Sequence, residues 1–159
     1  MDELLHLLQR NARETLENLA KILDSSAEDV RARIVEYERL GVIRGYQAIV
    51  NEECAEADKV IAVIEVKVTP EREHGFNQIA DCISKFSEVQ SLFLMSGAFD
   101  LLLFVTGSDM KAVARFVSEK LATIRGVVST STHFMLKTYK DHGLLMEAPH
   151  AVERLKVSP

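Results

Sequence analysis

Apolar residues recur every three or four positions along the first fifty residues, a pattern typical of helices that bury one face. It predicts three helices, with apolar faces formed by Leu4, Leu5, Leu7 and Leu8, by Leu16, Leu19, Ala20 and Leu23, and by Val30, Ile34, Tyr37 and Leu40. Thr15 is placed to cap the second helix. Ser26 with Asp29 matches a capping box at the start of the third helix, which Gly41 is placed to end. The short turn LDSS gives the spacing of a helix-turn-helix.

Residues 42–50 alternate enough to form a short hairpin or an extended segment after the third helix. Residues 1–50 are therefore expected to form a winged helix-turn-helix domain. The following stretch NEECAEADK, residues 51–59, is polar and acidic, and we expect it to be a hinge between two domains.

Beyond the hinge, strand patterns alternate with helical ones. Strands are predicted for residues 60–68, 89–95, 99–105 and 127–140, and helices for residues 76–83 and 110–124. This β-α-β-β-α-β order over residues 60–140 predicts a four-stranded antiparallel sheet with both helices on one face, the ferredoxin-like arrangement. The fold class is accordingly α+β. Residues 141–159 are expected to form a weakly patterned C-terminal tail.

Both faces of this sheet are predicted to be apolar at their centre. The first strand places Ala62 and Ile64 on one face but Ile61 and Val63 on the other, and the hairpin carries large apolar residues at both parities. A sheet face that is exposed to water normally carries polar residues, so that polar and apolar residues alternate along each strand. We expect the same sheet of a second copy to cover the open face in a symmetric dimer. The alternative cover is the tail of the same chain.

Charge and composition narrow the possible partners. The chain has 159 residues, 47% of them apolar, and a net charge of −5, and the first fifty residues hold nine acidic and seven basic side chains. DNA binding therefore needs a local cationic patch and more than one copy. An apolar run of about 18 residues, which a transmembrane helix requires, is not found. Cys54 and Cys82 lack a paired spacing, so we expect reduced thiols in a cytoplasmic protein.

The sequence offers little catalytic or metal-binding chemistry. Its five histidines are not spaced as ligand pairs, and no phosphate-binding loop, nucleophile elbow or Cys/His pair is present. We therefore expect no metal, no cofactor and no enzymatic activity.

Four stretches in this order resemble the Lrp/AsnC (leucine-responsive/asparagine-operon) family of transcriptional regulators, namely LAKIL, VRARIVEYERLGVIRGYQAIVN, SGAFDLLLFV and GVVSTSTHFMLKT. The resemblance covers about residues 2–140. It implies a sequence-specific regulator that binds double-stranded DNA through its winged helix-turn-helix. It also implies that the ferredoxin-like domain binds an amino acid or similar small metabolite. Dimers built through the sheets, often assembling to octamers, are implied as well.

The resemblance and the residue types together suggest six DNA contacts: Glu28, Arg31, Ala32, Arg33, Arg39 and Arg44. Arg33 matches a family arginine in the reading helix, and Arg44 lies where a wing cation meets phosphate. Glu28 and Asp29 make the first turn acidic. Their simplest role is to complement the helix dipole and cap free N–H groups, although Glu28 can also accept a hydrogen bond from a cytosine amino group.

For the effector, the resemblance points to Gly97, Ala98 and Asp100 in the hairpin loop and to the hydroxyls of Ser131 and Thr132 on the last strand. A loop glycine exposes backbone N–H groups to a carboxylate, while an aspartate attracts an ammonium, so the set suits a zwitterionic amino acid. The alternative is that the loop serves only as a tight hairpin turn.

Two other functions stay open at this point. The acidic first turn is compatible with an effector-binding or interaction protein that has lost DNA binding. Siroheme decarboxylases resemble the same family, but the hairpin VQSLFLMSGAFDLLLFV has no His, Arg or Tyr to hold an acidic tetrapyrrole.

Overall fold

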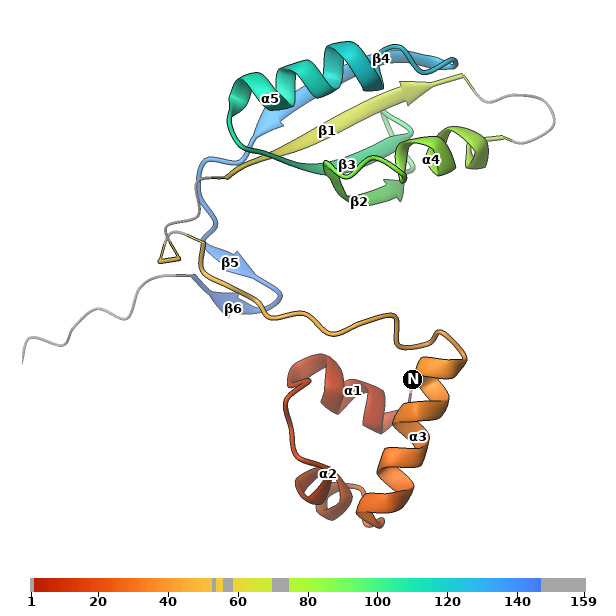
Figure 1. Ribbon diagram of the computed structural model, residues 1–159, viewed down its shortest axis with the longest axis vertical. Coiled ribbons are helices and arrows are strands. Elements are labelled where there is room, and N and C mark those ends of the chain that lie inside the picture. Colours follow the sequence, from red (N-terminus) through yellow and green to blue (C-terminus); the bar gives the residue numbers. More distant parts are fainter. Residues whose placement is uncertain (1, 53, 56–58, 70–74, 147–159) are drawn as a thin grey trace, which may run out of the picture. The chain divides into compact units, whose positions relative to one another are not determined.

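The structure is a computed structural model that describes residues 2–52, 54–55, 59–69 and 75–146. The chain divides into two compact units, Met1–Val50 and Asn51–Pro159. Figure 1 shows a helical first unit and a second unit built around a sheet. Each unit is described by itself.

The first unit contains three helices, α1 (Glu3–Arg10), α2 (Leu16–Ile22) and α3 (Ala27–Arg39). Its buried core consists of Leu4, Leu8, Leu19, Ala20 and Val30. The predicted partners Leu7, Leu16, Leu23, Ile34 and Tyr37 pack against that core half-buried. The helical spacing therefore predicted the core correctly except at two positions: Leu5 is not among the residues packed on it, and Leu40, at the C-cap of α3, is 58% exposed.

The predicted helix starts are confirmed by their hydrogen bonds. The Thr15 hydroxyl accepts from the Asn18 N–H at 3.2 Å and caps α2. The Ser26 hydroxyl accepts from the Asp29 N–H at 3.1 Å and donates to the Asp29 carboxylate at 2.7 Å. Each contact satisfies an amide that a helix leaves free in its first turn, so local sequence was sufficient to place these starts.

The end of α3 is also set locally. Gly41 has φ +69, the left-handed conformation that glycine adopts without a β-carbon clash. Its N–H donates to the Glu38 carbonyl at 3.0 Å, and the Val42 N–H donates to the Tyr37 carbonyl at 2.8 Å. These two bonds form a Schellman motif. Residues 44–50 then run on without helix or strand, so the extended alternative is observed and no wing hairpin forms among the described residues.

In the second unit, the four-stranded sheet consists of β1 (Val60–Val68), β2 (Val89–Leu94), β3 (Leu101–Gly107) and β4 (Val127–Phe134). Its order is β2-β3-β1-β4, and every neighbouring pair is antiparallel. The helices are α4 (Asn77–Ile83) and α5 (Met110–Arg115), which continues as the π-helical turn η1 (Phe116–Leu121). The predicted α+β fold with its four-stranded sheet is confirmed.

Both helices of this unit cover one face of the sheet (Figure 1). The shared core includes Ile79 and Ile83 from α4, Val113, Phe116 and Leu121 from α5 and η1, and alternate residues of β1 and β3. On β1 the buried positions are Ala62, Ile64, Val66 and Val68, as the alternation predicted.

The last strand ends earlier than predicted. β4 stops at Phe134, which pairs with Ala62, and one further bond joins the Met135 N–H to the Ile61 carbonyl of β1 at 2.9 Å. A separate small hairpin of β5 (Lys140–Asp141) and β6 (Leu144–Leu145) follows. The Asn51 side-chain amide donates to the Met146 carbonyl at 2.6 Å. The rest of the expected tail, residues 147–159, lies outside the described residues.

Within the described part of the chain, none of the helices has the length and apolar character needed to cross a membrane.

Candidate functional site

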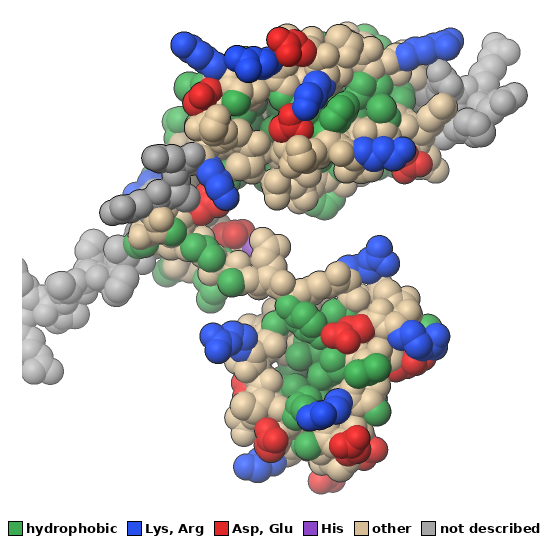
Figure 2. Space-filling model, viewed as in Figure 1, with side chains coloured by type: hydrophobic (Ala, Val, Ile, Leu, Met, Phe, Trp, Pro, Cys, Tyr) green, Lys and Arg blue, Asp and Glu red, His purple; other side chains and the backbone are tan. Residues whose placement is uncertain are grey.

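The outward side of α3 is the first candidate site. Glu28, Arg31, Ala32 and Arg39 are exposed on it, and Arg44 is exposed beyond the helix end. Figure 2 shows acidic and basic side chains interspersed over the side of the helical unit in view, without a continuous basic patch there. Any interaction with phosphate therefore depends on which of these arginines are free of acidic neighbours.

Arg33, the sixth predicted contact, is held by Asp2. One guanidinium nitrogen of Arg33 donates to both carboxylate oxygens of Asp2, at 2.7 and 2.9 Å. The Tyr37 hydroxyl donates to the same carboxylate. These bonds, that of Tyr37 first and that of Arg33 next, lower the pKa of Asp2 to about 2. Because Asp2 also caps α1 through the Leu4 N–H at 3.0 Å, Arg33 joins α3 to the start of α1.

The arginine near the end of α3 is also paired. Arg39 donates to Glu36 through two nitrogens, at 2.7 and 2.6 Å, and this contact lowers the pKa of Glu36. On the neighbouring turn, Glu38 accepts a hydrogen bond from the Tyr46 hydroxyl at 2.9 Å. Of these two acidic groups, Glu36 has its charge balanced by a cation, which reduces its repulsion of a phosphate, whereas Glu38 keeps its negative charge.

Two of the four arginines predicted to contact DNA have no acidic partner in the described part of the chain. Neither Arg31 nor Arg44 makes a hydrogen bond or ion pair with another described residue. Arg44 lies over the end of α3, where its Nη1 is 3.0 Å from the position that a β-carbon on Gly41 would take. Arg31 and Arg44 are thus the predicted contacts whose charge is available to a ligand.

One of the two acidic residues in the first turn of α3 has a structural role. The Asp29 carboxylate accepts from the Ser26 hydroxyl, which places Asp29 in the capping arrangement. Glu28 is exposed, and no partner is found for it among the described residues. Of the two acids, Glu28 is the one left to face a ligand.

The hairpin loop between β2 and β3 is the second candidate site. Gly97 is exposed at φ +147, where a side chain is strained, and a β-carbon there would meet no atom within 4 Å. Asp100 is half-buried and fastens the loop to β1: its N–H donates to the Val66 carbonyl at 3.0 Å, and its carboxylate accepts from the Val68 N–H at 2.8 Å. Asp100 therefore has a folding role that residue type alone did not reveal.

The two predicted hydroxyls do not lie together. Ser131 pairs with Glu65 and Thr132 pairs with Ile64, so they point to opposite faces of the sheet. Ser131 is exposed on the face opposite the helices, where its Oγ is 3.3 Å from His133 Nε2. His133 Nε2 in turn lies 3.5 Å from Glu65 Oε1. Within one chain, only one of the two hydroxyls can reach a ligand on a given face.

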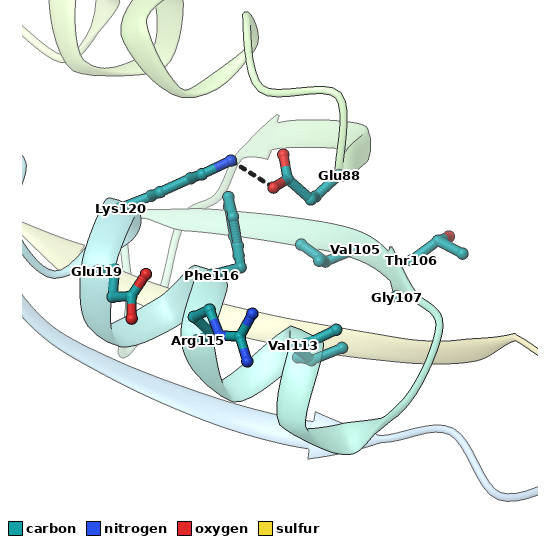
Figure 3. Close-up of a pocket in the computed structure, with 10 residues that line it drawn as sticks. Glu88, Val105, Thr106, Gly107, Val113, Arg115, Phe116, Glu119 and Lys120 are labelled. Carbon is teal, nitrogen blue, oxygen red and sulfur yellow. Dashed lines mark hydrogen bonds and ion pairs between the residues drawn. The ribbon is translucent and has the colours of Figure 1, made fainter.

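Sequence reasoning missed a hollow between the end of β3 and α5. It has a volume of about 290 Å³, and Thr106, Arg115 and Phe116 are among its lining residues (Figure 3). Lys120 Nζ spans one side to reach Glu88 Oε1 at 2.5 Å, which lowers the pKa of Glu88. The lining comes from separate elements, so no short motif signals it, and it contains none of the predicted effector residues.

Metal ligands do not cluster in the described ranges: no three His, Cys, Asp or Glu side chains there are placed to share an ion.

Comparison with known proteins gives consistent matches over most of the chain. Residues 61–145 match the Lrp/AsnC ligand-binding domain. The chain is 42% identical over 158 residues to the uncharacterized HTH-type transcriptional regulator YugG of Bacillus subtilis (strain 168), covering 99% of this chain and 95% of that protein. It is 28% identical over 144 residues to the leucine-responsive regulatory protein of Haemophilus influenzae (strain ATCC 51907 / DSM 11121 / KW20 / Rd), covering 91% and 86%.

A solved structure agrees with these matches. The crystal structure of a transcriptional regulator from Neisseria meningitidis, in complex with L-methionine, aligns with a TM-score of 0.68 and 28% identity over 89% of this chain and 93% of that one. The helical unit, the sheet domain that follows it and these matches together place the chain in the class of DNA-binding transcriptional regulators. The chain belongs to the Lrp/AsnC family of these regulators.

Proposed function

We propose that this protein is a cytoplasmic, sequence-specific regulator in which α3 reads double-stranded DNA and the sheet domain senses an amino acid. The observation that carries the DNA-reading part is the outward side of α3, where Arg31 is exposed and unpaired beside Ala32 while Arg39 is held by Glu36. Helices of this kind insert into the major groove and contact base edges through their exposed side. Arg31 and Arg44 supply charge to phosphate or guanine, and Glu28 faces the bases at the N-terminal end.

The wing of this domain is proposed to be residues 42–50. In the single chain residues 44–50 form neither helix nor strand, and the segment exposes apolar side chains, with Val42 54% and Val50 55% exposed. Arg44 at the start of this segment is the cation that we assign to a phosphate.

We further propose a dimer formed through the open sheet face. Phe93 is 49% exposed there, and the register places Leu102 beside it and Val63 beside Phe104. These four side chains make a contiguous apolar patch, because paired residues in adjacent strands point to the same face. A second copy of the patch is self-complementary in a two-fold dimer. Two α3 helices would then dock one helical turn of DNA apart, and dimers would assemble further to octamers.

The effector is proposed to be a zwitterionic amino acid at the β2–β3 loop. Gly97 and Ala98 offer an exposed backbone to its carboxylate, and the carboxylate of Asp100 faces its ammonium while also accepting from Val68. Ser131 is assigned as a contact from the open face. The complex of the Neisseria relative with L-methionine supports this ligand class. Effector action requires unequal affinity for two assemblies.

The DNA-reading proposal is tested with duplexes that the full chain enriches from a randomised pool. Arg31→Ala/Arg44→Ala should weaken retention of the enriched duplex at least tenfold at moderate salt and flatten its salt dependence. Arg10→Ala/Arg13→Ala removes the same charge from α1 and the following turn and serves as the matched control. If no sequence is enriched, the protein is instead an effector-binding or interaction protein. If both double variants lose the same amount of affinity for the enriched duplex, the binding is nonspecific.

A further inference from the structure

The side of α3 that faces away from the core carries an apolar residue at its centre. Val35 is 56% exposed, three residues after Ala32 and four after Arg31, which places all three on one side of the helix. The core of the unit is contacted by Val30, Ile34 and Tyr37 instead. Val35 therefore contributes nothing to the buried core of its own unit.

An exposed valine is also not a local optimum for a helix. Its β-branched side chain loses rotamer freedom against the preceding turn, so alanine or a long polar residue favours the helix more. A large apolar side chain in water adds no stability either. Helix formation and packing within the unit thus leave Val35 unexplained, which points to a contact outside it.

The charges around Val35 make its surroundings compatible with DNA. Arg39, one turn further on, is paired with Glu36, and Glu38 is hydrogen-bonded to Tyr46. Arg31, one turn before, is free among the described residues. An approaching duplex thus meets one available cation, the carboxylate of Glu28 at the N-terminal end, a small methyl group on Ala32 and the two methyl groups of Val35.

We propose that Val35 is a specificity residue that packs on the 5-methyl group of a thymine in the major groove. The inference rests on the proposed function of α3. Thymine is the base that presents a methyl group in that groove, and apolar side chains are its usual partners. Arg31, one turn away on the same side, positions the contact by binding a phosphate or a guanine nearby. The expected preference is therefore a thymine adjacent to the base or phosphate that Arg31 contacts.

The test removes the methyl group from the DNA instead of from the protein. The enriched duplex is prepared with thymidine and with deoxyuridine, and the affinity of the full chain is measured for both. Wild type should bind the deoxyuridine duplex about fourfold more weakly per buried methyl. Val35→Ala should bind the thymidine duplex more weakly and lose most of this discrimination.

Val128→Ala is the matched control, because Val128 is a valine of similar exposure, 62%, located on β4 in the other unit. It should discriminate between the two duplexes as wild type does. Equal discrimination by Val35→Ala and wild type overturns the inference while leaving DNA reading intact. If Val35→Ala changes the oligomeric state and not the discrimination, Val35 contacts a protein surface and the inference is wrong. If wild type enriches no duplex, the inference fails together with the proposed function, and that result is visible before any variant is made.

Discussion

The carboxylate of Asp2 and the guanidinium of Arg33 are 31 residues apart in the sequence and 2.7 Å apart in the folded unit. The contact ties the start of α1 to the middle of α3. Because the two side chains keep 30% and 39% of their surface exposed, water weakens their attraction. The contact therefore holds α3 against the start of α1 with modest strength, and contact of Arg33 with DNA would require it to leave Asp2.

Asp2→Asn should destabilise the helical unit by about 1 kcal/mol while keeping the cap of α1, since asparagine also caps helices well. Asp2 has its pKa lowered from 3.8 to about 2. Its stabilising effect is thus complete above about pH 4 and is lost as the pH falls through about 2. Hydrogen exchange of α1 and α3 amides in the full chain should show this loss in wild type and not in Asp2→Asn. Glu3→Gln, a neighbouring exposed acid, should behave as wild type.

Arg33→Ala should mainly reduce stability, whereas Arg31→Ala should mainly reduce DNA affinity. Arg33→Ala leaves the carboxylate of Asp2 without its cation and should lower unit stability by about 1 kcal/mol. Arg31→Ala should change stability by less than about 0.5 kcal/mol and reduce the slope of log affinity against log salt by about one per copy bound to DNA. Thermal unfolding and retention assays separate the two. A stability loss in Arg31→Ala equal to that in Arg33→Ala would contradict these assignments.

Substitutions at Asp100 should separate its folding role from an effector role. Asp100→Ala leaves the Val68 N–H without its acceptor and should cost about 1 to 3 kcal/mol of stability. Asp100→Asn keeps an acceptor oxygen but removes the charge, so the fold should be retained while affinity for the proposed amino-acid effector, first identified by screening amino acids, falls in calorimetry. If Asp100→Asn binds that amino acid as tightly as wild type does, the role of Asp100 is limited to folding.

Phe93→Lys should dissociate the proposed dimer. It places a charge in the middle of the open apolar face, where Phe93 packs edge-to-face on Phe104 with ring centroids 6.2 Å apart. Loss of a central aromatic contact costs about 2 kcal/mol or more, a factor of about 30 in the dimer dissociation constant. Sedimentation velocity over a range of protein concentrations measures this dissociation constant. Met110→Lys, which alters a side chain 53% exposed at the start of α5, is the control. A dimer unaffected by Phe93→Lys would place the interface elsewhere.

Much of the fold was determined by the sequence alone, because the signals are local. The capping bonds of Ser26 and Thr15 and the left-handed Gly41 each join residues within five positions of each other. Alternation along β1 likewise assigned the buried face, since strand periodicity requires no knowledge of the partner. The family resemblance added the regulator class.

The tertiary structure decided which candidate side chains are available. Arg33 was predicted as a DNA contact because it matches a family arginine, but packing of α3 against the start of α1 brings Asp2 to it. Asp100 was predicted as a ligand charge, but the approach of β1 gives it the Val68 N–H to accept. In both cases the partner is about thirty residues away in sequence, so only the packing of separate elements reveals that the charge is already in use.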